Sequence, residues 1–334
     1  MASYLLLLAP SANHLYADGA PRLGAAELAL TCADVGTVEA IELAGVDYLS
    51  FTAPDDDAIL EAVAGLSGRL ALFAVDGELL RPVELPVTDW LSDDLVTIPK
   101  YTGKTNEQFP RLLMNLTLAQ VRRPGEIRSV LDPLAGRGTT LLTCWLMGHH
   151  AYGVEGDAKA IEAMAAHVKT WLRRKRLKHQ AMTTPVRREG RMLGKRFDAT
   201  LRLADRPELK LGCFTGDARD SASLWGRKRF DAIVTDAPYG VVHGSARRGG
   251  NPQHRDRGPA ALLDEAIGVW ASQLHPGGAL GLSWNTHTLA REDLVEMIET
   301  AGLVVNNEGA WLDFSHRVDA SIQRDLVVAL RPED

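Results

Sequence analysis

The chain has 334 residues, 46% of them hydrophobic, and a formal net charge of −6 at pH 7. This length and apolar content predict a soluble protein of two domains, with a core that needs no disulfides. No stretch of roughly 18 apolar residues occurs, which excludes a membrane span, and the three cysteines include no C-x-x-C pair, which argues against a disulfide framework and a zinc site.

The charge is divided unevenly along the chain. Residues 1–95 hold three arginines and 16 acidic residues, a net charge of −13, whereas residues 96–334 carry +7. Such a division indicates two domains with different tasks. The basic segment, residues 96–334, can bind a polyanion. The apolar run at residues 4–8 has no basic residue before it, so we expect a strand rather than a secretory signal, and a cytosolic protein.

Residues 1–95 mix strand and helix patterns. Strand-like runs occupy 4–8, 41–42 and 70–75, and helical patterns occupy 25–31 and 55–64. We therefore expect a small α+β domain. Pro82, Pro86 and Pro99 mark a linker at its exit.

From residue 96 onward strands and helices alternate, which predicts an α/β fold with a mostly parallel sheet covered on both faces. The expected strands are 127–131, 150–154, 209–214, 230–235, 278–284, 303–306 and 325–330. The expected helices are 139–147, 157–178, 258–274 and 291–301.

A glycine turn follows the first of these strands, in the run Asp132-Pro133-Leu134-Ala135-Gly136-Arg137-Gly138-Thr139-Thr140. Glycine lets the backbone turn sharply and approach a ligand, and the helix that begins at once offers N–H groups with positive dipole character. Asp132 can accept from an ammonium group, so the segment suits the methionine end of S-adenosylmethionine. A dinucleotide fingerprint would need a third glycine where Leu141 stands, and a P-loop would need a lysine after Gly138. A plain strand-turn-helix remains the alternative.

Acidic residues also end the next two strands. Glu155, about 20 residues beyond the glycine turn, can accept from both ribose hydroxyls of a nucleoside. Asp217, followed by Ala218, can accept from an adenine amino group, or it can simply cap a helix.

The fourth strand ends in Asp236-Ala237-Pro238-Tyr239. Methylation of an amino nitrogen needs its lone pair turned toward the methyl donor. The Asp236 carboxylate and the Ala237 carbonyl can hold the two amino hydrogens, and Pro238 restricts Ala237 to an extended backbone. Tyr239 offers a flat face for a planar base. This turn predicts catalysis of amino methylation.

Together these segments resemble the class I S-adenosylmethionine-dependent methyltransferases that act on amino groups of nucleic-acid bases, and among them the THUMP-associated tRNA guanine-N2 methyltransferases. The resemblance covers about residues 98–330. It implies a Rossmann-like seven-stranded sheet in residues 96–334 and S-adenosylmethionine as cofactor. It also implies RNA as substrate, with tRNA as the first candidate. It also implies that Lys104 and Thr105, in the segment 101–109, touch the cofactor's methionine end, and that 316–324 is the family's C-terminal pattern.

Two features depart from that family. Ala237 replaces the first proline of its P-P pair, and residues 1–95 are acidic and shorter than a THUMP module with its flanks. The N-terminal domain is then a degenerate THUMP-like unit, with a protein as its possible partner, or the substrate is not tRNA. Methylation of DNA at adenine N6 or cytosine N4, of a small molecule or of a protein, and a non-catalytic binding role all stay open.

Two basic segments can contact phosphates. The run 173–179 is expected to continue the helix that starts at 157, and further cations follow at 187–196. A solvated helix end and an exposed insertion are the alternative. The glycine-rich segment 243–257 is expected to be a mobile lid over the catalytic turn, and a merely disordered loop is the alternative. Its histidines lack the partners that a metal site would need.

Overall fold

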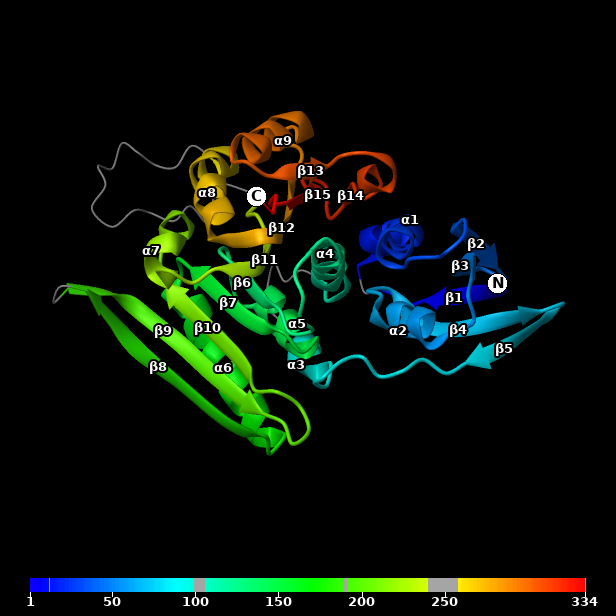
Figure 1. Cartoon of the computed structure of the whole chain (residues 1–334), viewed down its shortest axis with the longest axis horizontal. Coiled ribbons are helices and arrows are strands. Elements are labelled where there is room, and N and C mark those ends of the chain that lie inside the picture. Colours follow the sequence, from blue (N-terminus) through cyan, green and yellow to red (C-terminus); the bar gives the residue numbers. More distant parts are fainter. Residues whose placement is uncertain (12, 99–105, 189–190, 240–257, 334) are drawn as a thin grey trace.

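Two β-sheets organise the chain, one in each predicted domain (Figure 1). The computed structural model describes residues 1–11, 13–98, 106–188, 191–239 and 258–333. Among these residues, no helix has the length and apolar character that crossing a membrane requires.

The N-terminal sheet is antiparallel, with strand order β2-β3-β1-β4-β5. Its strands are β1 (Ala2–Leu8), β2 (Glu39–Leu43), β3 (Val46–Ala53), β4 (Arg69–Asp76) and β5 (Leu79–Val83). Helices α1 (His14–Thr31) and α2 (Asp57–Gly65) bury one face of it. The α+β prediction for this domain is confirmed.

Details of the N-terminal prediction were wrong. Helix α1 begins at His14 rather than near residue 25, because the side chain of Asn13 caps it by accepting from the backbone N–H of Tyr16. Strands β3 and β5 were not predicted. Pro82 lies within β5, at the edge of the sheet, where a missing N–H breaks no ladder, so the connection to the second domain begins after it. Pro99 lies outside the described residues.

The larger sheet has the order β13-β15-β12-β11-β6-β7-β10-β9-β8, and β14 pairs with β15. Its strands are β6 (Ser129–Asp132), β7 (His150–Glu155), β8 (Lys178–Arg188), β9 (Arg191–Arg202), β10 (Leu209–Thr215), β11 (Phe230–Asp236), β12 (Leu274–Asn285), β13 (Val304–Asn306), β14 (His316–Arg317) and β15 (Gln323–Leu330). Strands β10, β7, β6, β11 and β12 run parallel, and β15 returns antiparallel to β12.

The seven strands from β13 to β10 form the predicted Rossmann-like seven-stranded sheet, so the fold prediction is confirmed. Alternate residues along the strands face two separate apolar clusters. Helices α4 (Gln108–Ala119), α5 (Thr139–Leu146) and α6 (Ala158–Arg174) pack on one face. Helices α7 (Ser221–Trp225), α8 (Pro259–Gln273) and α9 (Arg291–Thr300) cover the other.

The hairpin β8–β9 extends this sheet and was not predicted. Helix α6 ends at Arg174 rather than at residue 178, and the chain turns into β8 at Lys178. Phe197 on β9 is fully buried against the α6 side, while the outer strand β8 is largely exposed. The basic run 173–179 therefore spans a helix end, a turn and the start of a strand, and does not form one helical face.

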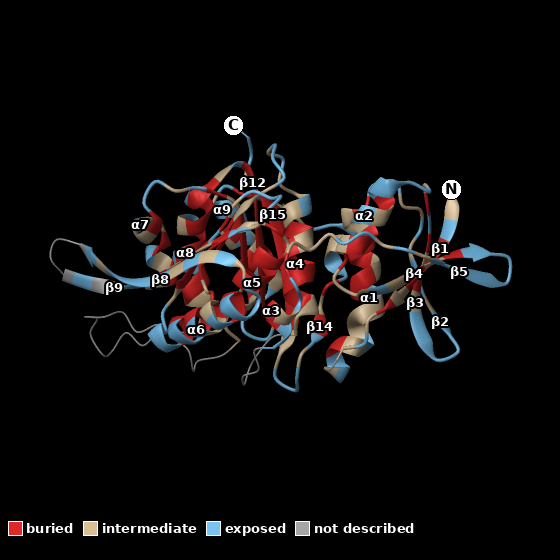
Figure 2. Ribbon diagram, turned by 90° about the horizontal axis from the view of Figure 1, so that it is seen from below, coloured by how far each residue is buried: buried red, intermediate tan, exposed pale blue. Residues whose placement is uncertain are grey.

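The two predicted domains meet at α1 and α4, and Figure 2 shows buried residues on both helices there. The carboxylate of Glu27 in α1 accepts from Asn115 Nδ2 of α4 at 2.7 Å and from the Ser67 hydroxyl at 2.6 Å. Arg22 donates to the carbonyl of Asp313 at 2.5 Å. Short connecting elements, α3 (Asp94–Thr97) and the turns η1 (Ala218–Asp220) and η3 (Gly309–Leu312), complete the described chain.

Candidate active site

The carboxyl ends of four neighbouring parallel strands meet along one edge of the large sheet. Asp132 ends β6, Glu155 ends β7, Thr215 ends β10 and Asp236 ends β11. Connections leave β6 and β11 in opposite directions, so the sheet has a topological switch point between these two strands. Ligands of open α/β sheets bind in the crevice at such a point.

The glycine turn lies over this edge. Gly136 and Gly138 have φ of +52° and +87°, in the left-handed region that favours glycine. The turn is tied to β7, because Ala135 donates its N–H to the Val154 carbonyl at 3.0 Å. A Cβ on Gly138 would lie 2.2 Å from Met164 Sδ, whereas a Cβ on Gly136 would meet nothing within 4 Å. The turn thus packs tightly on its inner side and leaves space beside Gly136.

Asp132 lies behind the turn with only 2% of its surface exposed. Its Oδ1 accepts from the Leu134 N–H at 3.0 Å and from the Thr235 hydroxyl at 2.8 Å, a bond that crosses the switch point. Burial, with a smaller contribution from the nearby Asp236 carboxylate, raises the pKa of Asp132 to about 7 against the opposing effect of these hydrogen bonds. A cationic ligand would favour its ionised form. Pro133 and Thr140 beside it are buried as well.

Glu155 holds the glycine turn in place. One carboxylate oxygen, Oε2, accepts from the Gly136 N–H at 2.7 Å, and the other, Oε1, accepts from the Asp157 N–H at 2.7 Å. The side chain is partly exposed at the strand end. Each carboxylate oxygen has a second lone pair that can accept from a ribose hydroxyl, so the ribose role stays a prediction.

Asp217 is the cap of η1, the alternative role that the sequence left open. Its Oδ1 accepts from the Arg219 N–H at 2.9 Å, and its Oδ2 pairs with the Arg219 guanidinium at 2.7 Å. Ala218 is buried, and its carbonyl accepts from Trp270 Nε1 at 3.0 Å. The adenine role of both residues stays a prediction, and Asp217 would have to share its carboxylate with Arg219.

At the predicted catalytic turn, the Asp236 carboxylate is surrounded by hydrogen-bond donors. Its Oδ1 accepts short hydrogen bonds from the Tyr239 hydroxyl and the Ser283 hydroxyl. Ala237 is 1% exposed and donates its N–H to the Ser283 carbonyl at 2.8 Å, which fixes the backbone before Pro238. Burial, with the Asp236 charge, raises the pKa of Tyr239 well above its usual range. Tyr239 is therefore a neutral donor to Asp236 here.

Three neighbours of the site were not predicted: Thr235, Ser283 and Arg324. Ser283 stands opposite Asp236 in the parallel ladder of β11 and β12, and Arg324 is the second residue of β15. The polar residues inside otherwise apolar strands were the available signal. Lys104, Thr105 and the predicted lid at 243–257 lie outside the described residues. Within the described part of the chain, no group of three histidine, cysteine or acidic side chains is arranged to hold a metal ion.

No protein-family model and no curated protein matches the chain. Among solved structures it is similar to TrmN from Thermus thermophilus, with 15% identity, a TM-score of 0.42 and coverage of 75% of this chain and 56% of that one. It is also similar to the 16S rRNA N2 methyltransferase RsmC of T. thermophilus, solved with AdoMet and guanosine, with 16% identity, a TM-score of 0.38 and coverage of 91% and 59%.

A third similar structure is a TehB-like SAM-dependent methyltransferase from Corynebacterium glutamicum, with 16% identity, a TM-score of 0.36 and coverage of 65% and 85%. The chain spans less than two thirds of the TrmN and RsmC chains. The fold assignment rests on the strand order of the large sheet.

Proposed function

We propose that this protein is an S-adenosylmethionine-dependent N-methyltransferase. The observation that carries the proposal is the line of acidic side chains, Asp132, Glu155 and Asp236, along the carboxyl edge of the sheet beside a left-handed glycine turn. Space beside Gly136 and a carboxylate whose pKa is raised to about 7 suit a ligand that carries an ammonium group.

Each residue has a task toward the cofactor. Asp132, with Pro133, Gly136, Gly138, Thr139 and Thr140, would hold the methionine end, Glu155 the ribose, and Asp217 with Ala218 the adenine. When bound, S-adenosylmethionine supplies an electrophilic methyl group on a sulfonium ion. Placed in the crevice at the switch point, that methyl group would face the carboxyl end of β11.

The residues at the end of β11 act on the acceptor. The Asp236 carboxylate and the Ala237 carbonyl would each accept one amino hydrogen, which orients the nitrogen lone pair and leaves the transfer to positioning and charge stabilisation. Since the Tyr239 hydroxyl now occupies Asp236 Oδ1, an entering amino group either displaces this hydroxyl or binds the other oxygen.

We further propose that the acceptor is the amino group of guanine in RNA, with tRNA as the first candidate. The net charge of +7 on residues 96–334 favours a polyanion over a small neutral molecule. A base within a folded RNA would have to be flipped out of its stack to reach Asp236.

The basic residues divide into two groups with different reach. Strand β9 pairs antiparallel with β10, and Arg196 stands opposite Phe214, near the carboxyl end of β10. Lys195 and Arg187 therefore lie near the tip of the hairpin, on the carboxyl edge of the large sheet. Arg173 and Arg174 end the 17-residue helix α6, about 25 Å from its start at that edge. We therefore assign the phosphate contacts to the hairpin.

Salt-dependent binding tests this assignment. The variant R187E/K195E should flatten the dependence of tRNA affinity on salt concentration, by about two in log–log slope, while R173E/R174E should leave the slope as in wild type. Equal slopes for wild type and R187E/K195E would show that the hairpin is not part of the RNA-binding surface.

The activity itself is tested with labelled cofactor. Wild type is incubated with S-adenosylmethionine carrying a tritiated methyl group and with unmodified tRNA, rRNA, double-stranded DNA or free guanosine, and the products are identified as nucleosides by mass spectrometry. We expect N2-methylguanosine in RNA, abolished by D236A and retained by D264A, a change of an exposed carboxylate on α8. If the label appears in DNA or in protein, that molecule and not RNA is the substrate. If D236A turns over as fast as wild type, the proposed catalytic site is refuted.

A further inference from the structure

A buried arginine stands behind the proposed catalytic turn. Arg324, on β15, is 3% exposed, and its Nη2 lies 3.6 Å from Asp236 Oδ2. Its Nε donates to the Tyr239 hydroxyl oxygen at 2.6 Å. Since that hydroxyl donates to Asp236 Oδ1, the guanidinium reaches the carboxylate both through space and through the phenol.

Two aromatic rings hold the guanidinium in place. Its central carbon lies 4.1 Å from the ring centre of Phe109 on α4 and 5.1 Å from that of Tyr239. Contacts of this kind stabilise a desolvated cation. Burial by itself would lower the pKa of Arg324, but Asp236 and Tyr239 outweigh it and the pKa is raised, so this arginine stays charged.

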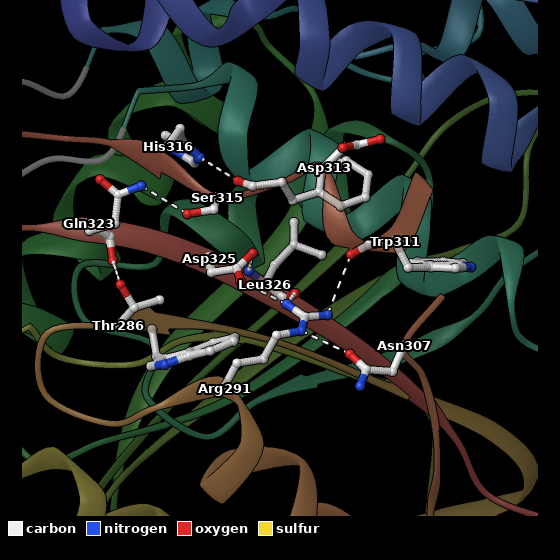
Figure 3. A network of polar contacts seen from close by, with 12 residues as sticks. Thr286, Arg291, Asn307, Trp311, Asp313, Ser315, His316, Gln323, Asp325 and Leu326 are labelled. Carbon is white, nitrogen blue, oxygen red and sulfur yellow. Dashed lines mark hydrogen bonds and ion pairs between the residues drawn. The ribbon is translucent and has the colours of Figure 1, made fainter. Parts of the chain in front are cut away.

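The strand that carries Arg324 is fixed on both sides (Figure 3). Its neighbour Gln323 donates to the Ser315 hydroxyl at 2.8 Å and accepts from the Thr286 hydroxyl at 3.2 Å. Asp325, the next residue, pairs with Arg291 at 2.7 Å. A planar guanidinium on such a rigid strand can set the position of its partners more narrowly than a flexible lysine can.

We propose that Arg324 is a positioning residue for methyl transfer, acting through Asp236 and Tyr239. It holds the Asp236 carboxylate in place as the amino acceptor, and it holds the Tyr239 ring in the orientation that receives the base. This inference rests on the proposed function, and Arg324 itself needs no contact with cofactor or substrate.

Other titratable groups lie around this cluster. Asp132 on β6 repels Asp236, while His316 on β14 and Tyr16 on α1 interact with Arg324. Burial lowers the pKa of His316 to about 4, so this histidine is neutral near pH 7.

The test compares R324M, which removes the charge, with R324K, which keeps it, and with R317M, a matched change of an exposed arginine on β14. We expect R324M to lower kcat for methyl transfer at least 100-fold at pH 7. The dissociation constant for S-adenosylmethionine should stay within threefold of wild type. R324K should recover about a tenth of the activity, and R317M should equal wild type.

A second measurement needs neither cofactor nor substrate. In a ¹H–¹⁵N spectrum of arginine-labelled protein, the Nε–H of Arg324 should be protected from exchange, should vanish in R324K and should shift in Y239F, because the Tyr239 hydroxyl is its acceptor. An Nε–H signal that Y239F leaves unmoved would overturn the proposed contact. This measurement decides the matter if R324M does not fold.

The outcomes separate the two proposals. If wild type transfers methyl groups and R324M has the same kcat, only the role of Arg324 is overturned. Loss of S-adenosylmethionine binding together with activity in R324M would also overturn it, because a structural role would then explain the loss. If wild type neither binds the cofactor nor transfers a methyl group, the proposed function is refuted, and so is the role of Arg324.

Discussion

Replacing Asp132 with asparagine should stabilise the protein above neutral pH. The carboxyl group is 2% exposed, and burial, as the largest cause, raises its pKa from 3.8 to about 7. Asparagine has the same shape and keeps an oxygen for the Leu134 N–H and the Thr235 hydroxyl, which now bond to Oδ1. Its amide can donate to the Thr140 hydroxyl, which also bonds to Asp132.

The sign and size follow from proton linkage. Because the folded-state pKa lies above the unfolded value, the native state binds more protons, and Asp132 lowers stability progressively as the pH rises from about 4 to about 7. The rise from 3.8 to about 7 corresponds to about 4 kcal/mol at pH 8 and about 2 kcal/mol at pH 5, at about 1.4 kcal/mol per pKa unit. The asparagine side chain does not titrate and is free of this cost, so D132N should gain these amounts over wild type.

The assay is urea denaturation of wild type and D132N at pH 5 and pH 8, with D264N, a change of an exposed carboxylate on α8, as control. The stability advantage of D132N should grow by about 2 kcal/mol between the two pH values, while D264N follows wild type. An advantage that stays constant with pH, or a loss of stability at pH 8, would refute the buried, proton-binding carboxyl group.

Three further predictions follow from the described contacts. Binding of S-adenosylmethionine near pH 7 should release about half a proton per protein, because Asp132, with a pKa of about 7, must ionise to bind the ammonium group. Calorimetry in buffers of different ionisation enthalpy measures the number of protons released, and a release of zero would contradict this prediction. G153A should lower the free energy of unfolding, measured by urea denaturation, by about 1–3 kcal/mol, because a Cβ at residue 153 would lie 2.8 Å from Leu141 Cδ1. E27A should lower the unfolding midpoint by removing the acceptor of two Ser67 donors at the domain interface; a midpoint equal to wild type would contradict it.

The central sheet and its acidic strand ends could be predicted because both are local signals. Each parallel strand is a short apolar run, and each acidic residue follows its run directly, as Asp132 and Asp236 do. Once the strands are parallel, their carboxyl ends must meet at one edge, so sequence order alone brings these side chains together.

The hairpin and the start of α1 could not be predicted in the same way. Only one face of β9 is apolar, with Phe197 and Leu201 buried, and the basic residues before β8 are typical of a helix end. Gly19 and Pro21 interrupt the helical pattern of α1, which packing against β1 and the second domain overrides.

The neighbours of Asp236 depend on contacts across long stretches of chain. Ser283 is 47 residues from Asp236, and Arg324 is 85 residues from Tyr239. No periodicity in the sequence connects such positions. They meet only because β12 lies between β11 and β15 in the sheet.

The most direct test of the account is the dissociation constant of S-adenosylhomocysteine, the demethylated cofactor, measured by titration calorimetry on wild type and on E155A. We expect saturable binding in the micromolar range for wild type and at least tenfold weaker binding for E155A, which loses the carboxylate that accepts from the Gly136 N–H. Absence of saturable binding to wild type, or equal binding to both proteins, would contradict a cofactor site at this edge of the sheet.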